Sequence, residues 1–137
     1  MIDKDLLMNK VNSIQNCLIR IRGKFKKESF DIYELDTQDI VILNLQRAIQ
    51  LTLDIAAHVV AAEKYGIPST LKENFILLER NGWIEPKLAE KLGKMVGFRN
   101  IAVHDYQIID PKILVKICEE HLTELEDFYS AILERKI

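Results

Sequence analysis

A short segment in the last third of the chain carries four polar side chains of different chemistry. They are the fixed cation of Arg99, the amide of Asn100, the imidazole of His104 and the phenol of Tyr106. Histidine ordinarily titrates at about pH 6.5, and arginine stays charged with a planar fork that fits phosphate. Cleavage of RNA without a metal needs a base, an acid and a cation facing the phosphoryl oxygens. The residue types of this segment therefore favour acid-base phosphoryl transfer, with Arg99 and His104 as catalytic residues and Asn100 in support.

Helical geometry limits what one copy of this segment can do. Five positions of an ideal helix place Arg99 and His104 roughly 140° apart around the axis, so they do not share a stripe. Asn100 and His104, four positions apart, do share a face. A site built from two protomers would bring the cation and the imidazole together and would supply two histidines for two proton transfers. A symmetric homodimer is therefore expected.

Two other interpretations of the same cluster stay open on the residues alone. The polar side chains can satisfy backbone carbonyls at a helix end beside Pro111, which is a purely structural role. They can also bind the phosphate of a nucleotide or of RNA without cleaving it, which would make the chain a non-catalytic binding module.

Other residues with chemical potential are fewer. Asp54 and His58 lie four positions apart and can orient a catalytic histidine, although a structural hydrogen bond is the favoured role. Cys118 and His121 resemble half of a zinc site, but no second pair at metal-ligand spacing exists in the sequence. Neither a metal nor a cofactor is expected.

One basic cluster and two aromatic residues complete the candidates. The cluster runs over residues 24–27 together with Arg20 and Arg22, and it can guide an RNA backbone or simply be a solvated helix end. Phe98 and Trp83 can stack on bases, but single aromatic residues near turns are more often core anchors. Phe98 ranks higher because it adjoins Arg99.

The elements that position these residues are predicted to be helices. Apolar residues recur at intervals of three and four in five segments, and no alternating strand pattern competes. Capping residues and helix-stopping residues mark the ends. The first expected helix begins at Asp3 and the fourth at Pro86, whereas capping residues mark the start of the others: Thr37 for the second, Ser69 and Thr70 for the third, and Asp110 followed by Pro111 for the last. The fourth helix is either carried through Gly97 or broken there. The last helix is expected to run without interruption to Ile132.

Length and composition agree with a small helical bundle. The 137 residues suit one domain spanning 1–137, with 48% hydrophobic and 29% charged residues. Short connections predict an all-α antiparallel bundle with a four-helix core and an added short helix. The formal charge of −2 excludes coating of nucleic acid by a globally basic surface, so any RNA contact must be local.

Cysteine usage and the N-terminus indicate the compartment. Cys17 and Cys118 lie far apart and form no spaced framework, so they are interpreted as reduced core thiols. Met1 to Lys10 offers no long apolar run, so neither a signal peptide nor a membrane span is predicted. A cytoplasmic protein is expected.

The spacing Arg99-(four residues)-His104-(one residue)-Tyr106 resembles the signature of HEPN proteins, and specifically of the HepT toxins. The flanking Gly97-Phe98 and the helix start at Asp110-Pro111 are also similar to that group. The second predicted helix resembles the group's second helix at Asn44, Ala48, Asp54-Ile55-Ala56 and His58.

The resemblance implies more than the residues show by themselves. It implies a helical bundle that dimerises with its motifs facing each other, and a metal-independent ribonuclease that uses Arg99 and His104. It also implies a partner antitoxin, a minimal nucleotidyltransferase, which attaches AMP to Tyr106. The RNA substrate, possibly tRNA, is not specified by the sequence.

Overall fold

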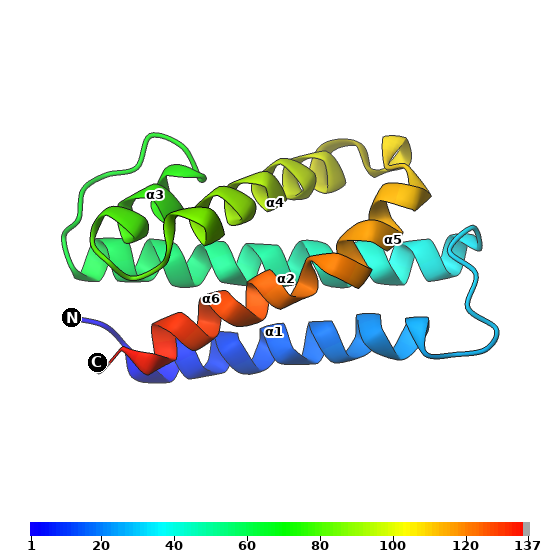
Figure 1. The fold of residues 1–137 in the computed structure, drawn as a ribbon, viewed down its shortest axis with the longest axis horizontal. Coiled ribbons are helices and arrows are strands. Elements are labelled where there is room, and N and C mark those ends of the chain that lie inside the picture. Colours follow the sequence, from blue (N-terminus) through cyan, green and yellow to red (C-terminus); the bar gives the residue numbers. More distant parts are fainter. Residues whose placement is uncertain (136–137) are drawn as a thin grey trace.

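The protein is a bundle of antiparallel helices (Figure 1). A computed structural model describes residues 1–135, and the side chain of Tyr106 lies outside that description. Within this part there are no strands, which confirms the predicted all-α class. The helices are α1 (Lys4–Phe25), α2 (Leu35–Ala62), α3 (Glu73–Arg80), α4 (Pro86–Asp105), α5 (Pro111–Glu120) and α6 (Leu122–Glu134), with a 3₁₀ turn, η1 (Tyr106–Ile108), between α4 and α5.

The apolar stripe of α1 defines the first layer of the core. Its buried residues recur at three and four positions, from Leu7 through Val11 and Ile14 to Ile21, as helical packing against one neighbour requires. Asp3 caps the helix, because its carboxylate accepts the backbone N–H of Leu6 at 3.1 Å. This helix packs along α2, and the two run antiparallel over most of their length (Figure 1).

Helix α2 is the central element. It packs against α1, α3, α4 and α6. Within the part of the chain that the structure describes, it is also the one helix long and apolar enough to cross a membrane, with a mean hydropathy of 1.3 over its most apolar window. Its contacts with four other helices account for that apolarity as core packing.

The start of α2 differs from the sequence prediction. Thr37 was predicted as the cap, but the helix begins at Leu35 with Glu34 in the cap position. The backbone N–H of Gln38 already bonds the Glu34 carbonyl at 3.0 Å, and the Thr37 side chain is buried. The Thr37 side chain therefore packs in the core, and of the described side chains none caps the start of α2.

The last predicted helix is two helices. A bend at His121, with φ −120° and ψ −4°, separates α5 from α6. The apolar spacing continues across it from Cys118 to Leu122 and Leu125, and neither glycine nor proline marks the position, so periodicity alone predicts one helix. After the bend, α6 packs against α2 and α4, and its Phe128 meets Phe75 of α3 edge to face with ring centroids 5.7 Å apart.

The segment that carries the polar cluster is continuous helix. Helix α4 starts at Pro86, as predicted, and is carried through Gly97 to Asp105. Asp110 then caps α5 by accepting the Lys112 N–H at 2.9 Å, with Pro111 in the first turn. Arg99, Asn100 and His104 therefore stand on the last turns of one helix.

We expect Gly97→Ala to raise the free energy of unfolding by roughly 0.5–1 kcal/mol, because alanine loses less backbone entropy in a helix interior. A Cβ at this position meets no atom within 4 Å. Gly82→Ala is the matched control: its φ of +78° disfavours any side chain, so it should destabilise the protein. Urea titration followed by circular dichroism measures both, and a less stable Gly97→Ala protein would contradict an unstrained, open helical position.

Candidate functional site

Arg99 is held at two points by neighbouring amides. Its Nε donates to the Oε1 of Gln50 on α2 at 2.9 Å, and one terminal nitrogen donates to the Oδ1 of Asn100 at 3.0 Å. The side chain is half-buried. Neither partner is a carboxylate, so the guanidinium keeps its full charge available while its orientation is fixed.

The Arg99 contact belongs to a longer chain of hydrogen bonds. The Nε2 of Gln50 donates to Asp54 at 2.8 Å, and the other Asp54 oxygen lies 3.5 Å from the Nζ of Lys10 on α1. Three helices thus contribute to the position of one guanidinium. Asp54 is the single carboxylate in this series of hydrogen bonds. Its two oxygens bond Lys10 and Gln50, so it does not neutralise Arg99.

Sequence reasoning missed Gln50 and Lys10. Gln50 and Asp54 lie four positions apart on the polar edge of an otherwise apolar helix, which is the usual spacing of an intrahelical hydrogen bond. That spacing could have identified the pair. Their link to Arg99 depends on how α2 and α4 pack, which no local pattern contains.

His104 stands apart from Arg99. It lies one turn beyond Asn100, near the end of α4, and its side chain is exposed. In residues 1–135, no hydrogen bond joins it to Arg99 or Asn100. The backbone of Tyr106 begins η1, and its side chain lies outside the described part. A single copy of the chain therefore brings Arg99 and Asn100 together, and within the described part the predicted histidine has no hydrogen bond to either of them.

Asp54 and His58 have different partners. Asp54 belongs to the chain that leads to Arg99, whereas the Nε2 of His58 accepts the backbone N–H of Asp3 at 2.9 Å. The favoured structural hydrogen bond is confirmed for His58, which anchors the start of α1 against α2. Asp54 acts on Arg99 through Gln50 and does not orient a histidine.

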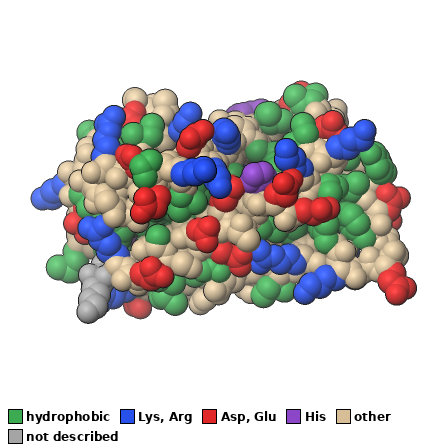
Figure 2. Space-filling view, in the orientation of Figure 1, with side chains coloured by type: hydrophobic (Ala, Val, Ile, Leu, Met, Phe, Trp, Pro, Cys, Tyr) green, Lys and Arg blue, Asp and Glu red, His purple; other side chains and the backbone are tan. Residues whose placement is uncertain are grey.

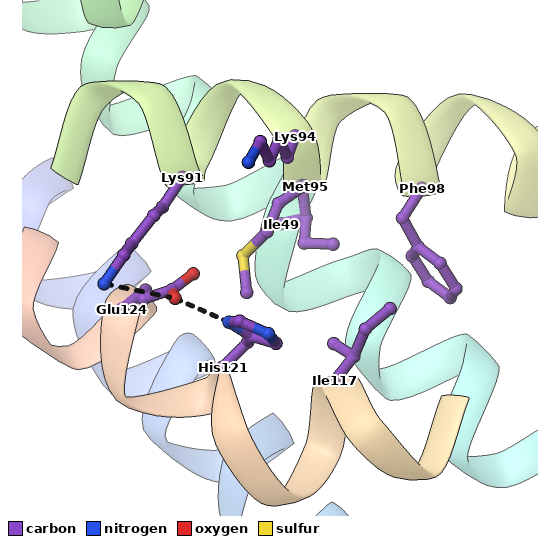
Figure 3. A pocket seen from close by; sticks show the side chains of 8 residues that line it. All are labelled: Ile49, Lys91, Lys94, Met95, Phe98, Ile117, His121 and Glu124. Carbon is purple, nitrogen blue, oxygen red and sulfur yellow. Dashed lines mark hydrogen bonds and ion pairs between the residues drawn. The ribbon is translucent and has the colours of Figure 1, made fainter. Parts of the chain in front are cut away.

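Phe98 points into an apolar cavity of about 240 Å³ between α4 and the α5–α6 bend (Figure 3). Met95 and Ile117 add apolar walls to it. At the far end, the buried carboxylate of Glu124 lies 2.6 Å from the Nδ1 of His121. Neither Arg99 nor His104 lines this cavity, so it is separate from the polar cluster.

The basic cluster predicted around α1 is divided between two faces. Arg22 forms a two-pronged ion pair with Glu126 on α6, at 2.6 and 3.0 Å. The hydrogen bonds of this pair raise the pKa of Arg22 and lower the pKa of Glu126. Arg22 is therefore held by its ion pair with α6. Arg20 instead lines a groove between α1 and α2 on the opposite side of α1.

Trp83 is a core anchor. It is 7% exposed, and its indole N–H donates to the hydroxyl of Tyr65 at 2.8 Å. The guanidinium of Arg135 lies over the ring, 4.3 Å from its centroid. These contacts tie the start of α4 to the end of α6 and leave the indole face covered.

The Cys118–His121 pair does not have the features of a metal site. Among the described residues, no group of three or more His, Cys, Asp or Glu side chains is placed to share a metal ion. Both cysteines are buried and unbridged, as predicted for core thiols. Burial raises the pKa of the Cys118 thiol to about 12, which disfavours the thiolate that a metal requires.

We expect iodoacetamide at pH 8 to alkylate Cys118 at least about 100-fold more slowly than it alkylates a small exposed thiol, because the thiolate fraction falls tenfold for each unit of pKa. Peptide mass spectrometry of the Cys17→Ser protein isolates the rate. The same protein in urea is the control and should react at the ordinary rate. Fast labelling of the folded chain would mean that Cys118 is accessible and ionised.

The all-helical bundle, with Arg99 and His104 on the last turns of α4, has the fold of solved HEPN toxins. The model of the ribonuclease HepT-like family matches residues 14–132. The chain therefore belongs to the ribonuclease HepT-like family, as the resemblance in the motif predicted.

Two relatives and one solved structure show the extent of the similarity. The mRNA nuclease HepT of Shewanella oneidensis is 40% identical over 128 residues, which cover 93% of this chain and 96% of the relative. The tRNA nuclease HepT of Aphanizomenon flos-aquae is 36% identical over 90 residues, covering 64% and 61%. The tri-AMPylated HEPN toxin of Shewanella oneidensis, solved in complex with an MNT antitoxin, superposes with a TM-score of 0.91 at 38% identity, over 97% of this chain and all of that one.

Proposed function

We propose that this protein is a metal-independent endoribonuclease toxin of a type II toxin-antitoxin pair, which cleaves RNA in the cytoplasm at a site shared by two copies of the chain. The observation that carries the proposal is the fixed Arg99 guanidinium, which is held by two neutral amides and keeps its charge for a phosphate. The two relatives named as mRNA and tRNA nucleases support an RNA substrate. The particular RNA, tRNA included, is left to experiment.

Arg99 supplies the cation of the reaction. In attack by a 2′-hydroxyl on the adjacent phosphorus, negative charge grows on the non-bridging oxygens, and a preorganised guanidinium stabilises that charge. The hydrogen bond to Gln50 fixes the fork before substrate arrives, so no reorganisation is needed at the moment of reaction. Asn100 holds the second edge of the guanidinium and serves as the supporting residue.

His104 supplies proton transfer. Its exposed imidazole is accessible to a substrate and would act as a general base for the 2′-hydroxyl or a general acid for the leaving 5′-oxygen. Two transfers require two groups, and a single chain offers one histidine in the motif. A dimer with facing motifs provides the second.

The surface around the motif suits a second copy of the chain. Half-exposed Ile101 and Val103 flank Ala102, which lines a shallow cavity with Leu43 of α2. Ile108, in the turn after α4, is 67% exposed. Burial of these apolar side chains against their symmetry mates would stabilise a dimer and place the two α4 ends together.

Control of the toxin is proposed to act at Tyr106. A partner nucleotidyltransferase would attach AMP to the tyrosine hydroxyl, as the tri-AMPylated relative in complex with an MNT antitoxin suggests. Tyr106 follows His104 by two residues, so an added phosphodiester would bring negative charge and bulk to the site. The modification would then compete with the RNA phosphate for Arg99.

We expect Arg99→Ala and His104→Ala each to lower the single-turnover cleavage rate by about 10²- to 10⁴-fold while the thermal midpoint changes little, because both residues act on the transition state more than on the core. Arg80→Ala, an exposed arginine on α3, is the matched control and should keep the parent rate. A His104→Ala protein that cleaves at the parent rate would remove the acid-base assignment. Binding without cleavage by the parent protein would favour the non-catalytic binding module.

We expect cleavage to persist in excess EDTA and to leave 2′,3′-cyclic phosphate or 3′-phosphate ends, since an internal 2′-oxygen is the attacking group. Denaturing gels with and without phosphatase treatment identify the ends. Loss of cleavage in EDTA, with recovery on adding a divalent cation, would show that the reaction depends on a metal.

Co-expression with the proposed partner nucleotidyltransferase should produce AMP adducts on Tyr106 and abolish cleavage. Tyr106→Phe has no hydroxyl to accept AMP, so this protein should stay toxic beside the partner. Tyr33→Phe, an exposed tyrosine in the α1–α2 connection, is the control and should be neutralised as the parent is. Intact-mass spectrometry and growth assays report both, and neutralisation of a toxic Tyr106→Phe protein would contradict modification at this residue.

A further inference from the structure

A groove of about 460 Å³ runs between α1 and α2 on the surface next to Gln50. Ser13, Asn16 and Arg20 line it from α1, and Arg47 and Gln50 line it from α2. Because α1 and α2 are antiparallel, Arg20 and Arg47 come from distant parts of the sequence to the same stretch of groove. The sequence did not reveal this pairing, which only helix packing creates.

The two arginines carry uncompensated charge. Both are exposed, and in residues 1–135 neither lies within 4.0 Å of a carboxylate. Both guanidiniums act on the Cys17 thiol, which lines the same groove, and lower its pKa against the larger raising effect of burial. Two cations placed together without an anion repel each other, so a bound anion would relieve that repulsion.

Acidic groups do not cancel this local charge. Along the groove side of α1, positions 10, 13, 17, 20 and 24 are occupied by cations or uncharged residues. On the facing edge of α2, Asp54 is engaged by Gln50 and Lys10. A chain with a net charge of −2 therefore has a basic strip at this place.

Gln50 links the groove to the proposed active site. Its side chain lines the groove, and its Oε1 accepts the hydrogen bond from Arg99. Gln50 therefore bonds Arg99 and shares a groove lining with Arg20 and Arg47. An extended polyanion that places one phosphate at Arg99 would continue along this strip.

We propose that the α1–α2 groove binds the sugar-phosphate backbone of the RNA segment next to the cleaved phosphate, with Arg20 and Arg47 contacting successive phosphates. This inference rests on the proposed ribonuclease function. Contacts of this kind are independent of base sequence and weaken with salt, because each bound phosphate releases counterions. The groove would give the enzyme affinity for RNA chains without specifying the bases at the cut.

The test uses fluorescence anisotropy of a single-stranded RNA with full-length protein carrying His104→Ala, so that the RNA stays intact. Adding Arg20→Gln and Arg47→Gln should raise the Kd roughly 10- to 100-fold. The slope of log Kd against log salt should fall by about 1.4, or about 0.7 for each lost phosphate contact with a single strand. In the chain with His104 intact, the half-saturating RNA concentration should rise by the same factor.

The charge-matched control carries Lys87→Gln and Lys116→Gln, two exposed cations on α4 and α5 away from the groove. It loses the same net charge, so it should leave the Kd and the salt slope near the parent values. If both double variants changed the Kd and the salt slope equally, the effect would come from net charge and not from the groove, and the proposal would be overturned. If the parent protein bound RNA through the groove but did not cleave it, the groove proposal would stand and the proposed nuclease activity would be wrong. The two claims can therefore fail separately.

Discussion

The hydrogen bond between Arg99 and Gln50 constrains the whole site. At 2.9 Å it holds the guanidinium on the side of α4 that faces α2. His104 follows five residues later on the same continuous helix, roughly 140° around its axis. The fold thus places the cation and the imidazole on different sides of one helix, and the proposed acid-base cleavage would take the two groups from two copies of the chain.

The same hydrogen bond connects the proposed catalytic arginine to helix packing. Gln50 reaches Asp54, and Asp54 reaches Lys10, so the position of Arg99 depends on how α1, α2 and α4 lie together. The space-filling view shows charged side chains of both signs mixed over the face that carries α4, α5 and α6 (Figure 2). Separately from this mixed face, the uncompensated arginines of the α1–α2 groove share its lining with Gln50, which accepts the hydrogen bond from Arg99.

Local sequence patterns predicted the elements better than they predicted the contacts between them. Apolar spacing and the Asp110-Pro111 cap located the helices, because core burial and capping act within a few residues. The bend at His121 was missed because it interrupts the backbone without interrupting the apolar spacing. Arg99, Asn100 and His104 were placed on one helix correctly, but the Gln50 support and the diversion of Arg22 to Glu126 arise from residues 49 and 104 positions apart.

The most direct measurement of the central claim is the cleavage rate of a hybrid dimer made from one Arg99→Ala chain and one His104→Ala chain. Two different affinity tags isolate the hybrid, and native mass spectrometry verifies its composition. We expect the hybrid to cleave RNA in EDTA faster than either variant alone but more slowly than the parent dimer, because it pairs Arg99 of one chain with His104 of the other and lacks the second histidine. A hybrid that forms but is as inactive as both parent variants would contradict a site shared between two copies.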